Sequence, residues 1–241
     1  MSDTGTTDLN FLNLLREFGA VGEFARFARR VWTWPFSRRA ERQRAILLIP
    51  GFLAGDVTLY PFADWLRSRG HQVFFSGILA NADCPRHAID RLEGILLEQS
   101  ARYEEKLVVI GHSLGGIYAR ELARRLPQCV DQVILLGAPI RHPLKHANPY
   151  VKMLGLVTRH IRETSRGCRG DIATICGVHS FDPPPGVAET IVYSKSDGVV
   201  DWMGCLETGP DVTAFEVDST HCGLPYNLDT MRIIQERIEE D

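Results

Sequence analysis

The sequence lacks any apolar run long enough to cross a lipid bilayer. Its longest strongly apolar stretches, around residues 45–55 and 133–140, fall well short of the ~20 residues that a membrane-spanning helix needs. The polar, acidic opening at residues 1–8 also lacks the positive and apolar regions of a secretory signal. We therefore expect a soluble, cytoplasmic protein.

An excess of positive charge is also missing, since 27 lysines and arginines face 30 acidic residues and the net charge is −3. No global electrostatic attraction to nucleic acid is expected. No Cys-x-x-Cys pair or zinc-ligand spacing occurs among the six cysteines. His142 and His146 are four apart, but Pro143 disfavours the helix that a metalloprotease motif requires. We predict no metal and no cofactor.

What the sequence does have is an alternation of short apolar runs with longer amphipathic stretches. The apolar runs are continuous, which is typical of strands covered on both faces in a parallel sheet. With 241 residues and 44% hydrophobic content, the chain predicts a doubly wound α/β domain with helices on both faces of a mostly parallel sheet. Strands are expected at 45–49, 72–75, 107–110, 132–136, 191–193 and 212–217, and helices at 60–69, 86–104, 114–126 and 227–240.

We divide the chain into an N-terminal part, residues 1–44, and a catalytic domain, residues 45–241. The N-terminal part combines a polar tail with an amphipathic helical arm, whose apolar residues recur at close to the helical period. Large aromatic side chains and seven arginines accompany this stripe, so the arm either packs on the domain or contacts an anionic membrane as a peripheral element. Within the domain, the pattern loosens around residues 141–188, which we interpret as a small cover segment.

The clearest chemical motif follows the strand at residues 107–110. Gly111-His112-Ser113-Leu114-Gly115-Gly116 contains G-x-S-x-G between a strand and a helix, the context in which that pattern forms a nucleophile elbow. A sharp turn there holds the serine in strained dihedrals with its hydroxyl exposed, and glycines avoid collisions with the neighbouring backbone. Ser113 is the predicted nucleophile.

A serine hydroxyl needs a base of pKa near 7 and a third group that orients this base. Asp197 follows the strand at 191–193, and His221 lies in a loop between the last strand and the last helix. The order Ser113, Asp197, His221 matches the order of triad residues in α/β-hydrolases. Asp201, four residues after Asp197, is a rival for the acid.

An oxyanion hole requires two backbone N–H donors. Leu114, directly after the nucleophile, should supply one of them. Phe52 should supply the other, because Gly51 permits a tight turn in the loop after the first strand.

These motifs resemble those of the α/β-hydrolase superfamily and, within it, small lipases and esterases, over roughly residues 45–240. The resemblance rests on the Pro50-Gly51-Phe52 loop, the elbow at 111–116, the turn at 194–200 and the His221-Cys222-Gly223-Leu224 segment. Many relatives carry histidine where this chain has Pro50, so the oxyanion geometry depends on less evidence than the triad.

The resemblance implies hydrolysis of a carboxylic ester, from a small molecule or a lipid, through an acyl-enzyme on Ser113. An apolar acyl group would suit the stripe at Tyr150, Met153, Leu154, Leu156 and Val157, which could equally be the buried face of a helix. Two alternatives remain: an acyltransferase using the same triad, and a non-catalytic binding module on the same fold.

Overall fold

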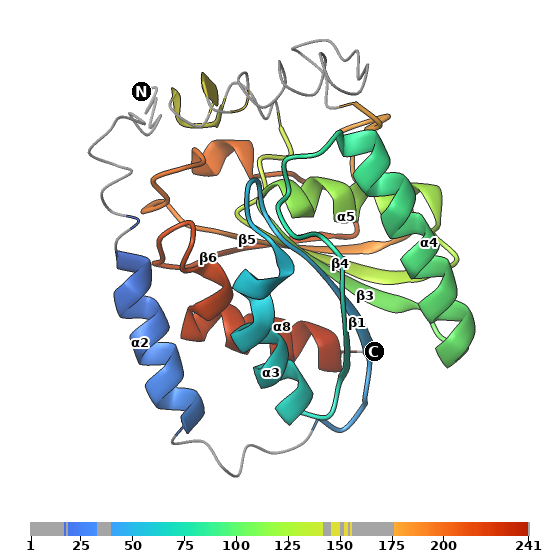
Figure 1. Cartoon of the computed structure of the whole chain (residues 1–241), viewed down its shortest axis with the longest axis horizontal. Coiled ribbons are helices and arrows are strands. Elements are labelled where there is room, and N and C mark those ends of the chain that lie inside the picture. Colours follow the sequence, from blue (N-terminus) through green and yellow to red (C-terminus); the bar gives the residue numbers. More distant parts are fainter. Residues whose placement is uncertain are drawn as a thin grey trace.

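The computed structural model describes residues 17, 19–32, 40–141, 146–149, 152–153, 155 and 176–240. At its centre is a six-stranded sheet in the order β2-β1-β3-β4-β5-β6, in which all neighbouring strands are parallel (Figure 1). The strands are β1 (Ala45–Ile49), β2 (Gln72–Phe75), β3 (Leu107–His112), β4 (Val130–Leu136), β5 (Ala188–Tyr193) and β6 (Val212–Glu216).

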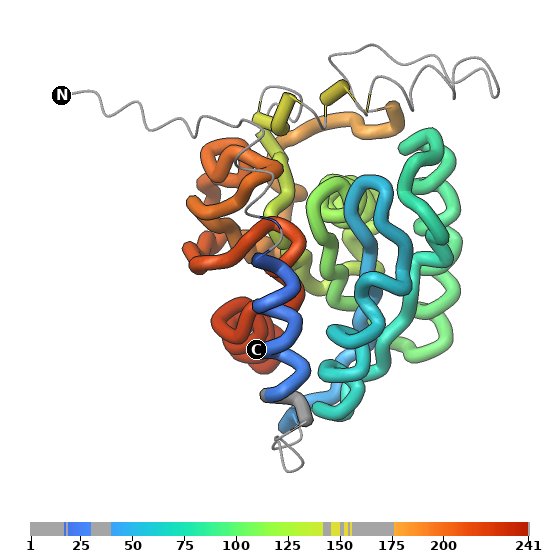
Figure 2. Tube along the Cα trace, turned by 60° about the vertical axis from the view of Figure 1, so that its left-hand side comes forward, coloured from blue at the N-terminus to red at the C-terminus, as the bar shows by residue number. Residues whose placement is uncertain are grey.

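Helices cover both faces of this sheet. Helices α4 and α5 pack on one face, and α2, α3 and α8 pack on the other (Figures 1 and 2). The predicted doubly wound α/β fold is confirmed. The helices are α2 (Gly19–Trp32), α3 (Tyr60–Ser68), α4 (Pro85–Tyr103), α5 (Leu114–Arg125) and α8 (Leu228–Glu239).

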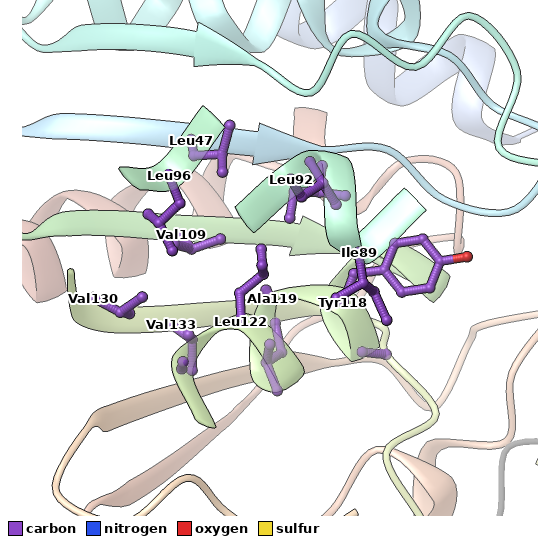
Figure 3. Packing of buried hydrophobic residues seen from close by; sticks show 14 of the residues in the cluster. Leu47, Ile89, Leu92, Leu96, Val109, Tyr118, Ala119, Leu122, Val130 and Val133 are labelled. Atoms are coloured by element: carbon purple, nitrogen blue, oxygen red, sulfur yellow. The ribbon is translucent and has the colours of Figure 1, made fainter. Parts of the chain in front are cut away.

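Two hydrophobic cores follow from this layering. Successive side chains of a strand point to opposite faces, so Leu47 packs toward α4 and α5, while Leu48 packs toward α3 and α8. Figure 3 shows the first core, where Leu92 of α4 and Leu122 of α5 close over the sheet. All five residues of β1 are buried, which explains why this strand reads as a continuous apolar run.

Most elements end within one or two residues of their predicted bounds, but β5 begins three residues earlier than predicted. The first residues of this strand do not form an apolar run, because they include Glu189. The structure pairs the Glu189 carboxylate with Arg120 of α5 at 2.7 Å, with side-chain exposures of 0% and 2%. A buried charge is tolerated when it is paired in this way. A segment that contains a glutamate can therefore form the first part of an interior strand.

The order in which the chain adds strands to the sheet reverses direction next to β1. The chain runs from β1 outward to β2 and then returns to the other side of β1 with β3. In open α/β sheets, ligands bind beyond the carboxyl ends of strands at such a reversal. The loops after β1 and β3 both leave the sheet there, and they carry Phe52 and Ser113.

The predicted helical arm appears as α2, which lies on the domain surface. Phe27 is 2% exposed, and its ring and that of Phe24 lie 5.4 and 5.3 Å from the ring of Tyr226. The buried face of the described part of α2 therefore packs against the domain itself. No helix in the described part of the chain is both long and apolar enough to cross a membrane.

The predicted cover segment falls mostly outside the described residues. Met153, which is described, is 60% exposed. The remaining expectations for this segment lie outside the described part, namely those on His142, Tyr150, Leu154, Leu156 and Val157.

Candidate active site

Ser113 lies in a strained turn between β3 and α5. Its backbone has φ 53° and ψ −120°, in a region that residues with a side chain rarely occupy. The turn is held by close backbone packing: a Cβ at Gly115 would lie 2.3 Å from the carbonyl oxygen of Ile49. Such local strain is characteristic of functional sites, and the geometry is that of the predicted elbow.

Asp197 and His221 meet although they follow different strands. His221 Nδ1 lies 2.6 Å from Asp197 Oδ2, and both side chains are buried. The other oxygen of Asp197 accepts hydrogen bonds from the backbone N–H groups of Val199 and Val200, at 2.8 and 2.7 Å. The carboxylate is thereby fixed in the orientation in which it contacts the imidazole.

Asp201, the rival acid, has a different partner. Its Oδ2 lies 3.1 Å from Nδ1 of His146, and its Oδ1 accepts the backbone N–H of Met203. It therefore caps a short 3-10 helix, Trp202–Gly204, and holds the segment that contains His146.

His112 connects the elbow with the loop of His221. Its Nε2 donates to the carbonyl oxygen of His221 at 2.9 Å, and the two rings lie 4.8 Å apart. Burial and the neighbouring His221 lower the pKa of His112 to about 3, so this side chain is neutral at physiological pH. Because His112 directly precedes Ser113, this contact places the ring of His221 beside the elbow.

The electrostatic environment of His221 favours its protonated form. Burial acts to lower the pKa of His221, but the charge and hydrogen bond of Asp197, followed by the charge of Glu17, raise it above its ordinary value. An imidazole in this setting is stabilised when it takes up a proton.

The loop after β1 lies against the elbow. A Cβ at Gly51 would lie 3.0 Å from Cβ of Ser113, a contact tighter than side chains usually make, so the loop approaches the elbow closely. The N–H of Phe52, the next residue, makes no hydrogen bond within the described part of the chain. Leu114 is the first residue of α5, and first-turn N–H groups have no partner inside their own helix. Both predicted donors thus border Ser113.

Asn81, which the sequence analysis missed, holds this loop in place. Its side chain donates to the carbonyl oxygen of Pro50 at 2.8 Å, and its backbone pairs with Leu53 and Ala54 at 3.0 and 2.8 Å. Nothing in the sequence marks Asn81, because the contact joins two loops that are about 30 residues apart.

Two acidic residues of the arm were also missed. Glu17 accepts the backbone N–H groups of His221 and Cys222, and Glu23 accepts the backbone N–H of Thr220 in the same loop. On an amphipathic helix, such carboxylates are indistinguishable in sequence from ordinary solvated residues.

Among the described residues, no group of three or more histidine, cysteine and acidic side chains could hold a metal ion. The side chains gathered here instead offer a hydroxyl, an imidazole and a carboxylate beside backbone N–H donors. That set is suited to nucleophilic attack on a carbonyl group.

Comparisons with known proteins agree with the fold. A family model described as a PGAP1-like alpha/beta domain matches residues 74–203. Methyl jasmonate esterase 1 of Vitis vinifera is 26% identical over 165 residues, which are 65% of this chain and 59% of that protein. The chain thus spans less than two thirds of the length of this relative.

Similar solved structures include several lipases and esterases. A lipase B of Aspergillus fumigatus has a TM-score of 0.59 at 17% identity, covering 83% of this chain and 53% of its own. Polyneuridine aldehyde esterase has a TM-score of 0.53 at 15% identity, over 83% of this chain and 100% of its own. A Bacillus licheniformis lipase in mature form has a TM-score of 0.59 at 13% identity, over 85% and 95%. The predicted α/β-hydrolase fold and the resemblance to lipases and esterases are confirmed.

Proposed function

Because the chain belongs to the family of PGAP1-like alpha/beta domains, we propose that it is a serine hydrolase that cleaves carboxylic esters through Ser113. Its lipase-like and esterase-like homologues support ester hydrolysis as the class of reaction. The observation that carries the specific proposal is the 2.6 Å contact between His221 and Asp197, in a loop that His112 ties to the elbow.

In the first half of the reaction, Asp197 accepts the Nδ1 proton of His221 in a hydrogen bond, which leaves Nε2 free to act as a base. Ser113 Oγ attacks the ester carbonyl carbon and transfers its proton to Nε2. The N–H groups of Phe52 and Leu114 stabilise the oxyanion. When the intermediate collapses, the ester C–O bond breaks and the alcohol leaves with the proton from His221.

In the second half, water replaces the alcohol. His221 takes a proton from the water molecule, whose oxygen attacks the acyl-enzyme carbonyl. The bond to Ser113 Oγ then breaks, the serine recovers its proton from His221, and the carboxylic acid is released. Asp197 remains ionised throughout and stabilises the imidazolium that forms in each half.

The substrate we propose is a carboxylic ester of a small molecule or a lipid. The relative from Vitis vinifera is named for a methyl ester, which supports this class. A series of p-nitrophenyl esters with graded acyl length would identify the preferred acyl group.

The central test is active-site labelling. A fluorophosphonate probe should modify the wild type at Ser113, and Ser113→Ala should lose the label together with roughly 10⁴-fold or more of kcat. The melting temperature of the variant, which should stay near that of the wild type, controls for folding. Unchanged turnover in Ser113→Ala would contradict the proposal.

A further inference from the structure

The carboxylate of Glu17 joins the two loops that carry Asp197 and His221. Its Oε1 accepts the backbone N–H of Gly198 and that of His221, both at 3.0 Å. Its Oε2 accepts the N–H of Cys222 at 2.8 Å. One side chain of the arm thus bonds to the residue after the acid and to the backbone of the histidine itself.

Glu23 secures the same histidine loop from inside α2. This side chain, 6% exposed, accepts the N–H of Thr220 at 2.9 Å and the hydroxyl of Ser219 at 2.8 Å. It occupies the space over Gly223, where a Cβ would lie 1.4 Å from its carboxylate. Bonds to a charged acceptor are shorter and stronger than neutral ones, so this arrangement resists movement of the loop.

The contacts of Glu17 matter more for chemistry than those of Glu23, because they reach His221 directly. When Ser113 gives up its proton, His221 becomes an imidazolium, and a nearby negative charge stabilises it. The hydrogen bonds of Glu23 go to Ser219 and Thr220, so Glu23 anchors the loop one and two residues before the histidine.

We propose that Glu17 is a positioning residue for ester hydrolysis, holding the Asp197 turn and the His221 loop together and stabilising the imidazolium that forms at His221. This role rests on the proposed function, because it acts through His221. The N-terminal arm then becomes part of the active site rather than an appendage.

The titratable groups near His221 come from four segments. Asp197 contacts its ring from the loop after β5, and the ring of His112 lies beside it at the end of β3. Glu17 of the arm bonds to its backbone N–H, and Cys222 follows it directly in the same loop. His112 stays neutral because burial, then the charge of His221, lowers its pKa to about 3. Loss of hydration, then the charge of Glu17, raises the pKa of Cys222 to about 12. The carboxylates of Asp197 and Glu17 are therefore the charged groups that act against burial and raise the pKa of His221.

The test uses the full chain with Glu17→Gln and measures the hydrolysis of p-nitrophenyl butyrate between pH 5 and 9. His221 must be neutral to act as a base, so removal of a negative charge should move the midpoint of kcat/KM to lower pH, by about half a unit or more. We expect kcat to fall about tenfold with little change in KM, as for an interaction made mainly in the transition state.

Glu23→Gln is the matched control. It removes a buried carboxylate that contacts the same loop but leaves Glu17 in place, so it should lower the melting temperature without moving the pH midpoint. Equal shifts of the midpoint in the two variants would overturn the proposal, since loosening of the loop alone would then account for both.

Labelling by a fluorophosphonate separates this proposal from the one on which it rests. An unlabelled, inactive wild type would overturn the proposed function. A labelled and active wild type, with the same kcat and midpoint in Glu17→Gln, would overturn only the role of Glu17. Should Glu17→Gln fail to fold, Glu17→Asp takes its place: it keeps the charge but withdraws the carboxylate by one methylene. A lower kcat with an unchanged midpoint would support the proposal, and wild-type kcat would overturn it.

Discussion

Asp197 and Asp201 lie four positions apart in one loop, yet the fold gives them different partners. Asp197 contacts His221 at 2.6 Å, whereas Asp201 contacts His146 at 3.1 Å and caps a 3-10 helix. The direction of each side chain, not its place in the sequence, therefore separates an acid that can orient a catalytic base from one that stabilises a loop.

Replacement of each acid by its amide tests this difference. Asp197→Asn should lower kcat on the order of 10⁴-fold, because the amide favours the wrong tautomer of His221. Asp201→Asn should lower kcat far less and act mainly on the melting temperature. Steady-state kinetics of both variants provides the measurement. Reversed costs would mean that Asp201 is the acid.

The pH dependence of activity follows from the environment of His221. Asp197 and Glu17 outweigh the effect of burial and raise the pKa of His221 above its ordinary value of 6.5. The base is active when neutral, so kcat/KM should rise with pH through a midpoint above 6.5. A pH profile of kcat/KM between 5 and 9 checks this. A flat profile would contradict the role of His221.

At the scale of elements, the elbow depends on how closely β1, β3 and α5 approach one another. Gly115 is the second residue of α5 and lies against the end of β1. A side chain there would clash with the backbone of Ile49. Gly94 lies within α4, where a Cβ would meet nothing within 4 Å. The two glycines therefore offer a matched comparison.

Gly115→Ala should destabilise the protein by about 2 to 3 kcal/mol, because overpacking against a buried strand forces the backbone to shift. Gly94→Ala should instead stabilise it by about 0.5 to 1 kcal/mol, since alanine favours a helix interior. Urea unfolding measures both, and the rate of fluorophosphonate labelling reports on the elbow. Similar effects in the two variants would contradict the close approach.

The arm provides a second test at this scale. Phe27 is 2% exposed against Tyr226, so Phe27→Ala should cost about 3 kcal/mol of stability. Val21→Ala, at a site that is 70% exposed on the same helix, should change stability by less than about 0.5 kcal/mol. Melting curves of both variants measure this. Strong binding to anionic vesicles that is lost in a chain beginning at residue 40, without a change in melting temperature, would instead favour a membrane role for the arm.

For the whole molecule, buried histidines link stability to pH. His71 is 4% exposed and accepts the backbone N–H of Arg44. Burial, then the charges of Arg44 and Arg69, lowers the pKa of His71 to about 4, and the pKa of His112 is lowered to about 3. In the unfolded chain both would titrate near 6.5. As the pH falls below 6.5, the unfolded state therefore binds more protons than the folded state, and stability decreases.

We expect the urea midpoint to fall between pH 7 and pH 4. The raised pKa of His221 has the opposite effect only above about 6.5, because its contribution to stability is complete below that pH. The two histidines with lowered pKa values therefore determine the slope below it. His71→Asn, which keeps an acceptor but does not titrate, should flatten this dependence. An equal slope in the variant and the wild type would show that His71 does not contribute.

The sequence by itself determined the layered α/β fold, the positions of most strands and helices, and the elbow at Ser113. These features follow from local patterns: continuous apolar runs for covered strands, helical spacing for α8, and glycines where the backbone turns sharply. The sequence also indicated His221 as the base and Asp197 or Asp201 as the acid, because the order of these residues and their positions after predicted strands can be read from it.

Only the tertiary structure decided which residues meet. The start of β5 depends on the pairing of Glu189 with Arg120, which are 69 residues apart. The bond from Glu17 to the backbone of His221 spans 204 positions, and no local pattern distinguishes that carboxylate from a solvated one. The physical reason is that the free energy of a buried charge depends on the donors around it, and those donors are brought together only when distant loops converge at one edge of the sheet.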